Sequence, residues 1–343
     1  MTISTDKLQE VTRIITHDLC ADGTASAILL HDALPYAKIE FVQYGTPAYK
    51  ALAPEPGILF VDFSPPPERA QAFVDAGAMI LDHHSGAKDV VALFGENGVF
   101  ADELTEPGIS GASLAYDHVW KPFCMFEPPT DRINRARAAF ALQLSLLAGV
   151  RDTWQRNHIW WHDACAQAEA LHFFPNSYWM AKPFNMIMEE LDIDGAMFTI
   201  GKMLIQKKDE NVQKCIENAY RFTSKRGTRV IVFEGVIETS DAAEKLGDSV
   251  DLVIGFKTVC EPEVFVQAFD IPQQPKYIFS TRSHSSFNCS AFAKYFGGGG
   301  HTKAAGFAQM FTANYEAATS RLDVCVNPFS FAENCVDMFE AAP

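Results

Sequence analysis

Short apolar runs alternate with amphipathic stretches through the first 150 residues of the chain. Four apolar runs predict strands, at 11–16, 39–43, 57–62 and 78–82. Two of the intervening stretches predict helices, at 24–34 and 68–76. Strands that alternate with helices favour a parallel sheet covered on both faces. Because such sheets bind ligands at the carboxyl ends of their strands, we expect the functional residues there.

The pattern changes twice in the rest of the chain. Residues 131–225 keep apolar side chains at helical spacing, which predicts a run of helices. Beyond them, four apolar runs predict the strands of a second sheet, at 228–237, 250–259, 263–271 and 276–283, with a helix near 241–247. We therefore expect an α/β protein in three parts: a parallel-sheet N-terminal domain at 1–185, a helical connector at 186–225 and a smaller α/β C-terminal domain at 226–343.

Composition and charge narrow the function classes. The chain has 343 residues, of which 48% are hydrophobic and 21% charged, which is typical of a folded protein with two domains. Its net charge of −15 argues against a broad basic surface for long nucleic-acid duplexes. The 8 cysteines form no CxxC pair, so neither a disulfide scaffold nor a zinc site of the usual spacing is expected. The N-terminus is polar and no long apolar run occurs, so we expect a cytoplasmic protein that does not bind membranes.

Carboxylate and imidazole side chains stand where three predicted strands end. They are His17, Cys20 and Asp22 in HDLCADG, Asp62 at the end of GILFVD, and Asp82, His83 and His84 after AMIL. A further acid, Asp152, follows a long helical stretch in GVRDT. Each motif taken alone is also compatible with a polar turn or a helix cap. Together they predict a metal site at one sheet edge, because acids at this density repel one another unless a cation neutralises them.

These motifs resemble those of the DHH phosphoesterase superfamily, which includes RecJ-type exonucleases, nanoRNases, cyclic-dinucleotide phosphodiesterases and exopolyphosphatases. The matching segments are HDLCADGTASA, FVD, LDHH, GISGASLAYDHVW and GVRDT. The segment FSTRSHSSFNCSAFAKYFGGGGHTKAAGF, at 279–307, resembles the substrate domain of the RecJ and nanoRNase branch. The resemblance covers nearly the whole chain. It disfavours the pyrophosphatase branch, which carries a different C-terminal domain.

The resemblance implies a set of metal ligands. They are His17, Cys20, Asp22, Asp62, His83 and Asp152. Asp62 would bridge two ions, and Mn²⁺ is the expected metal, with Mg²⁺ or Co²⁺ as alternatives. Cys20 stands where many relatives carry an aspartate, although some carry the H-x-x-C-x-D-G version found here. It leaves open a thiolate ligand, a weaker second site or a single-metal centre, and Asp18 is an alternative ligand.

The resemblance also implies catalytic and substrate-binding residues. His83 and Asp62 would act at the reacting phosphate, and His84 would hydrogen-bond the phosphate or the leaving oxygen. The C-terminal domain would present its residues across a cleft and hold a phosphate or nucleotide end through Arg282, Ser283, Gly297, Gly298, Gly299, Gly300 and His301. Four successive glycines can expose backbone N–H groups to a phosphate, and Arg282 and His301 can add charged donors.

The implied activity is that of a Mn²⁺-dependent phosphodiesterase. Such a hydrolase would cut short oligonucleotides to 5′-mononucleotides by metal-activated water, as a nanoRNase, oligoribonuclease or exonuclease does. A nucleotide bisphosphate, a cyclic dinucleotide and polyphosphate are alternative substrates of the same chemistry. A non-catalytic nucleotide-binding regulatory protein is the alternative from another class, although the intact acidic ligands favour an enzyme. The expected partner is a short oligonucleotide or nucleotide, and a homo-oligomer stays open.

An aromatic cluster follows GVRDT. It comprises Trp154, Trp160 and Trp161, together with His158 and His162. The two histidines have the helical i, i+4 spacing of a metal pair, but no third ligand stands near them in the sequence. We therefore expect this cluster to form a packing or interface patch.

Overall fold

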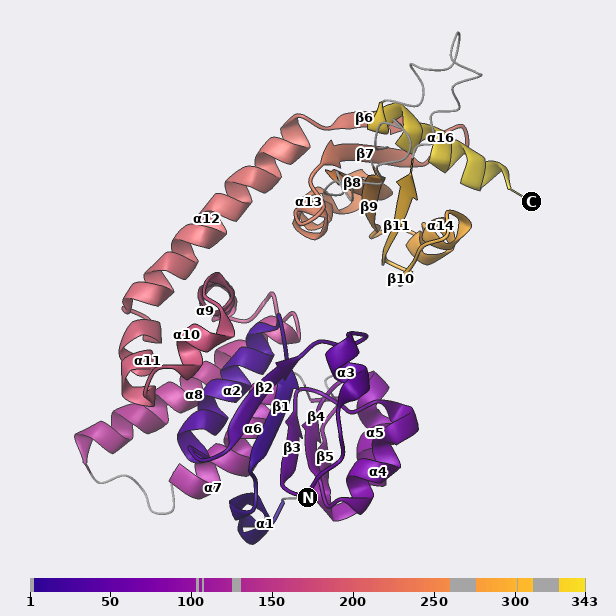
Figure 1. The fold of residues 1–343 in the computed structure, drawn as a ribbon. Helices are drawn as coiled ribbons and strands as arrows, with labels where there is room; N and C mark the ends of the chain where they lie inside the picture. The colour runs from indigo at the N-terminus through magenta and orange to yellow at the C-terminus, as the bar shows by residue number, and fades with distance from the viewer. Residues whose placement is uncertain are drawn as a thin grey trace, which may run out of the picture. The chain divides into compact units, whose positions relative to one another are not determined.

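The computed structural model describes residues 3–102, 105–106, 108–124, 131–259, 276–300, 302–310 and 327–342. The chain forms two compact units, Met1–Gln206 and Lys207–Pro343. The division lies inside helix α12 (Ala196–Glu217), within the range 186–225 where a connector is predicted (Figure 1).

The first unit is built on a parallel sheet of five strands in the order β2-β1-β3-β4-β5. They are β1 (Arg13–His17), β2 (Lys38–Val42), β3 (Ile58–Val61), β4 (Met79–Asp82) and β5 (Gly98–Phe100). The four predicted strands are therefore confirmed, and β5 is an addition. Every residue of β3 and β4 is buried, because helices cover both faces of the sheet. This burial is why both strands read as continuous apolar runs.

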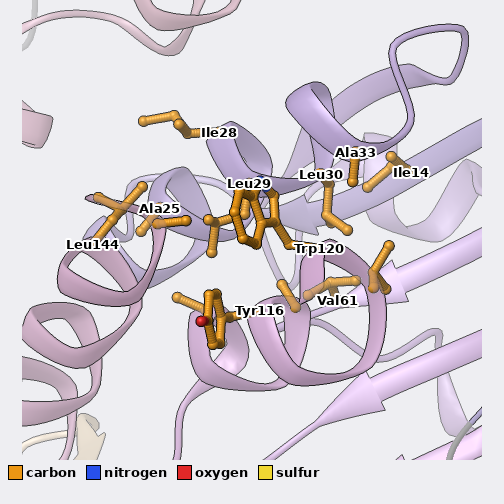
Figure 2. Packing of buried hydrophobic residues seen from close by; sticks show 14 of the residues in the cluster. Ile14, Ala25, Ile28, Leu29, Leu30, Ala33, Val61, Tyr116, Trp120 and Leu144 are labelled. Carbon is orange, nitrogen blue, oxygen red and sulfur yellow. The ribbon is translucent and has the colours of Figure 1, made fainter. Parts of the chain in front are cut away.

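Helices cover the two faces of this sheet in separate layers. One layer contains α2 (Ala21–Ala33), α6 (Gly111–Ala115), the π-helix η4 (Tyr116–Trp120), α8 (Arg132–Asp152) and α9 (Trp161–Phe173). The other contains α3 (Pro47–Ala51), α4 (Ala70–Asp75) and α5 (Lys88–Leu93). Figure 2 shows Trp120 and Tyr116 packed beneath Leu29 of α2. Because α2 lies between the sheet and other helices, most of its own residues are buried, and these are mainly apolar or small.

Short elements complete the first unit. They are α1 (Thr5–Gln9), η1 (Pro67–Arg69), η2 (Ser85–Ala87), η3 (Gly95–Asn97), α7 (Lys121–Cys124), α10 (Asn176–Met180) and α11 (Phe184–Leu191). The helices predicted over 131–225 are confirmed as α8 to α12, but the end of this range is wrong: α12 ends at Glu217, and Tyr220–Thr223 form strand β6 of the second unit. None of the helices in the described ranges is both long enough and apolar enough to cross a bilayer.

The second unit is built on a mixed sheet of six strands in the order β10-β11-β9-β8-β7-β6. They are β6 (Tyr220–Thr223), β7 (Arg229–Glu234), β8 (Leu252–Val259), β9 (Lys276–Arg282), β10 (Gly299–Gly300) and β11 (Ala304–Met310). β7 and β8 are parallel, and the other neighbours are antiparallel. Three of the four predicted strands are confirmed as β7, β8 and β9, and the fourth, 263–271, lies outside the described residues.

Helices also cover both faces of the second sheet. Helices α14 (Cys289–Tyr295) and α16 (Pro328–Ala341) pack against one face. Helix α13 (Thr239–Leu246), followed by η5 (Gly247–Ser249), and the later turns of α12 pack against the other. Helix α12 contributes to both units, since Phe198 packs with α8 and Val212 packs with the second sheet.

Candidate metal centre

The carboxyl edge of the first sheet gathers acids and imidazoles from four elements. Asp62 directly follows β3, His83 follows β4, Asp22 lies in the first turn of α2, and Asp152 ends α8. The Nε2 atom of His83 lies 3.2 Å from Asp62 Oδ1, 3.4 Å from Asp152 Oδ2 and 3.7 Å from Asp22 Oδ2. Residues that are 130 positions apart in the sequence, from 22 to 152, therefore meet around one imidazole nitrogen.

Because these carboxylates are buried close together, their negative charges are unfavourable without a cation. Asp62 is 1% exposed, and burial together with the charge of Asp22 raises its pKa well above the usual range. Its Oδ2 atom is buried and accepts no hydrogen bond from any described residue. A divalent metal ion would supply both the missing partner and the missing charge. The residues present therefore fit a metal centre.

The possible ligands form three overlapping groups. In each group one donor atom per residue lies within 4.8 Å of the others, and the groups are Asp22–His83–Asp152, Asp62–His83–His84 and His17–Cys20–Asp62. All six predicted ligands are thus brought together, and His84 joins them. Asp62 and His83 each belong to two of the groups, and of the two only the Asp62 carboxylate has two oxygens with which to bridge two ions. Whether one ion or two bind stays a prediction.

The N-terminus of α6 holds the Asp22 carboxylate in place. The N–H groups of Gly111 and Ala112 donate to its two oxygens at 2.6 and 3.0 Å. A Cβ atom at position 111 would lie 2.3 Å from Cβ of Asp62 and 2.9 Å from Asp22 Oδ2, so only glycine fits. In the sequence, the segment GISGASLAYDHVW carries part of the DHH resemblance but indicates no role for its residues. The role is to place a helix N-terminus, with its partial positive charge, against a buried acid.

A side chain that the sequence analysis missed fixes the ring of His17. The Oε1 atom of Gln43 accepts a hydrogen bond from the N–H of Tyr44 at 2.9 Å and lies 2.9 Å from His17 Nε2. Because this oxygen is an acceptor, His17 Nε2 carries the proton and Nδ1 keeps its lone pair. Nδ1 is buried, has no hydrogen-bond partner among the described residues and lies 3.9 Å from Asp62 Oδ2. Burial also lowers the pKa of His17, which favours the neutral form that binds metals.

The first motif differs from its prediction in one structural detail. The sequence predicts a helix at 24–34, whereas α2 begins at Ala21 with Cys20 as its N-cap residue. Gly23 lies inside the helix, where a Cβ atom would lie 2.3 Å from the carbonyl oxygen of His17. The glycine is needed because α2 approaches the end of β1 closely. This approach brings Cys20 and Asp22 to the sheet edge.

The two other polar residues of this motif have different surroundings. Burial, with the nearby charge of Asp62, raises the pKa of the Cys20 thiol well above its usual value, so a cation is needed to favour the thiolate. The Asp18 carboxylate accepts hydrogen bonds from the Leu19 N–H and from Asn176 Nδ2, both at 2.9 Å. It is in none of the three ligand groups found in the described ranges.

Asp82 orients His84 and is not part of a ligand group found among the described residues. Its Oδ1 atom lies 2.8 Å from His84 Nδ1 and accepts from the His84 N–H at 3.0 Å, while Oδ2 accepts from Ser64 Oγ at 2.5 Å. Burial opposes the charged form of His84, but the bond to Asp82 and the nearby carboxylate charges outweigh it and raise the pKa to about 9. His84 is therefore an imidazolium near neutral pH, with its side chain 40% exposed. His83, in contrast, is buried.

In the second unit, Arg282 ends β9 close to the start of β11. The register pairs it with Ala304, next to Ala305, which pairs with Gly300. Its guanidinium donates to Ser240 Oγ at 2.9 Å and to Ser280 Oγ at 3.1 Å, and it has no carboxylate partner in the described ranges. Burial lowers the pKa of Arg282, as expected for a charge without a counter-ion.

The other residues predicted to bind substrate differ in whether their backbone N–H groups are free to bind a phosphate. The N–H groups of Gly297 and Gly298 donate to the carbonyls of Lys294 and Ala293, so these two groups are used within the turn and are not exposed to a phosphate. Gly299 and Gly300 form β10, and Ser283 is buried with its N–H bonded to Lys303. His301 lies outside the described residues. The binding role of these residues stays a prediction.

The chain was also compared with known proteins. No family model and no curated protein matches it. It is similar to the solved structure of a pGpG-specific phosphodiesterase, PggH from Vibrio cholerae, with a TM-score of 0.57 and 13% identity over 97% of this chain and 100% of that one. A DHH domain from a member of a family of ribosomal proteins matches with a TM-score of 0.49 and 11% identity over 96% and 87%. An uncharacterized protein from Helicobacter pylori G27 matches with a TM-score of 0.40 and 12% identity over 92% and 98%.

At these identities the likeness is one of fold. The chain has the architecture of a solved phosphodiesterase along nearly its whole length. The α/β fold class predicted from the strand and helix pattern is confirmed. The resemblance to the DHH superfamily stays a prediction. The roles predicted for individual residues stay predictions.

Proposed function

We propose that the chain is a metal-dependent phosphodiesterase that hydrolyses linear dinucleotides and other short oligonucleotides to 5′-mononucleotides. The observation that carries this proposal is the buried, unpartnered Oδ2 of Asp62, which lies among further acids and imidazoles at the carboxyl edge of a parallel sheet. A binding protein has no need to hold such repelling groups together. The similar fold of a pGpG-specific phosphodiesterase supports a dinucleotide as the substrate.

The metal would be held by residues of the first unit alone. Asp22, Asp62, His83 and Asp152 would form one site, with Asp62 shared with His17 and Cys20. We propose Mn²⁺, with Mg²⁺ or Co²⁺ as alternatives, because imidazole and carboxylate ligands suit these ions. When bound, the metal supplies positive charge for the phosphate oxygens and makes a water nucleophilic near neutral pH.

Side chains outside the metal site would bind the phosphate groups of the substrate. His84 is held by Asp82 through Nδ1, and its pKa is raised in the metal-free protein, so a protonated Nε2 would donate to a phosphate or leaving oxygen. Asp82 fixes that orientation and does not itself touch the substrate. In the second unit, Arg282 offers a guanidinium without a described acidic partner, which suits a terminal phosphate.

The proposal is tested with purified protein and Mn²⁺ on a panel of phosphate esters. The panel holds pGpG, a 5-mer, a 24-mer, a cyclic dinucleotide, a nucleotide bisphosphate and polyphosphate, with products separated by chromatography. We expect turnover of pGpG and the 5-mer, loss of turnover in His83→Ala, and unchanged turnover in His162→Ala, which alters an exposed histidine. Binding of pGpG without turnover of any panel member would overturn the proposal and favour a regulatory nucleotide-binding protein.

A further inference from the structure

The turn that follows Asp152 has an unusual residue at its tightest point. The N–H of Gln155 donates to the carbonyl of Val150 at 3.0 Å, and the N–H of Trp154 donates to that of Arg151 at 3.3 Å. These two bonds define a Schellman motif, which ends a helix with one residue in the left-handed conformation. That residue is Trp154, with a φ of +52°. Glycine is usual there, and a bulky side chain is strained.

The strained residue keeps its ring accessible. Trp154 is 47% exposed, although large aromatic side chains are mostly buried. The Arg151 guanidinium carbon lies 4.3 Å from the centre of the Trp154 ring and 5.5 Å from that of Trp161. The guanidinium carbon of Arg156 lies 4.8 Å from the Trp154 ring centre. We call Trp154 with Arg151 and Arg156 the Trp154 platform: an aromatic ring flanked by planar cations.

The platform adjoins the candidate metal centre. Trp154 is two residues after Asp152, whose Oδ2 lies 3.4 Å from His83 Nε2. Two residues span at most about 7 Å of chain, so the Cα atoms of Trp154 and Asp152 lie within about the length of one nucleotide of each other. Arg151 makes no ion pair with a described carboxylate, so its charge is available to an anionic or electron-rich ligand.

On the basis of the proposed function, we propose that the Trp154 platform binds a nucleobase of the substrate beside the phosphate that is cleaved. A base can stack on an indole or on a guanidinium plane, and each has the flat, partly polar surface that such stacking uses. A purine is favoured because it covers more of the platform, and guanine most, because a guanidinium can donate to its O6 and N7 atoms. A side chain that served only to end the helix could be glycine, without the strain.

This inference differs from the packing patch that the sequence predicts. Trp161 is partly buried and belongs to the cluster with Leu147, Val150 and Phe198, so part of the aromatic group does pack. Trp154 is not part of that cluster. Within the aromatic group, Trp154 is therefore the exposed ring next to the candidate metal ligand Asp152, whereas Trp160 and Trp161 pack against the core.

The experiment uses two substrates and three variants of the full chain with Mn²⁺. The substrates are pGpG and a 5′-phosphorylated dinucleotide analogue that lacks both bases. The variants are Trp154→Gly, which removes the ring and fits the left-handed turn, Trp154→Phe, which keeps a smaller ring, and Ile159→Ala as a control on the same loop, where Ile159 is 90% exposed. Thermal unfolding of each variant is measured in parallel.

We expect Trp154→Gly to raise KM for pGpG about five-fold or more, since stacking of one base contributes at least this factor. KM for the base-free analogue should not change, Trp154→Phe should lie between wild type and Trp154→Gly, and Ile159→Ala should match wild type. An unchanged KM for pGpG, or an equal rise for both substrates, would overturn the inference while leaving the proposed function intact. Failure of the wild-type protein to bind or cleave pGpG would overturn both.

Discussion

Gln43 lies outside the motifs of the sequence, yet it sets the protonation of the candidate metal ligand His17. Gln43 follows β2 and lies 26 positions after His17, yet its side chain decides which ring nitrogen carries the proton. Nδ1 therefore keeps its lone pair for a metal ion, at 3.9 Å from Asp62 Oδ2. Mutation of a hydrogen-bond partner of this kind typically lowers metal affinity or activity about 10–100-fold.

Replacing Gln43 should weaken metal binding without unfolding the protein. We expect Gln43→Leu to lower the affinity of the ion held by His17 about 10–100-fold, measured by calorimetric titration with Mn²⁺. Gln43→Glu keeps an oxygen acceptor and should restore much of the affinity. Gln71→Leu, on the surface of α4, is the control. Equal affinities for wild type and Gln43→Leu would show that the tautomer of His17 does not matter.

The pair of His84 and Asp82 should give the metal-free protein a distinct pH dependence. The His84 pKa is raised from 6.5 to about 9, so the stability that this pair contributes is full below about pH 6.5 and is lost as the pH rises through about 9. We expect an NMR titration to give a His84 pKa near 9 in the metal-free protein. Asp82→Asn should bring it back toward 6.5. A wild-type value near 6.5 would contradict the hydrogen-bonded pair.

At the scale of elements, helix α6 controls the distance between two acids. Its N-terminal N–H groups bind Asp22, and the bare Cα of Gly111 lets Asp62 approach. Gly111→Ala should push these carboxylates apart. We expect it to lower Mn²⁺ affinity about 10–100-fold and to cost about 1–3 kcal/mol of stability. Gly86→Ala is the matched control, because a Cβ atom there meets nothing within 4 Å. Normal Mn²⁺ affinity in Gly111→Ala would disprove this role.

The elements also show what the sequence can and cannot predict. Strands β3 and β4 are buried on both faces, so their apolar runs identify them and place Asp62 and His83 at the sheet edge. The short β5 and the glycine strand β10 carry too few side chains to leave a pattern. The contacts of Gln43 and Gly111 join distant parts of the chain, so they depend on the packing of α2 and α6 against the sheet and leave no local signal.

At the scale of the whole molecule, all candidate metal ligands found in the described ranges lie in one unit. They fall between residues 17 and 152, whereas the second unit begins at Lys207. We expect Mn²⁺ to slow hydrogen exchange of the metal-free protein in β3, α2 and α6 and to leave exchange in β7 and β8 unchanged, as measured by mass spectrometry. A chelator should reverse the effect. Equal protection of both units would contradict a centre confined to the first.

The order of the ligands along the chain has a consequence for how the protein is made. Asp152 at the end of α8 is the last of them to leave the ribosome, and the whole second unit is synthesised after it. Until that helix docks, the acids before it repel one another at an incomplete site, because a metal binds tightly only to assembled ligands. Metal capture therefore depends on the arrival of α8, and the last ligand is in place in the chain before any residue of the second unit is translated.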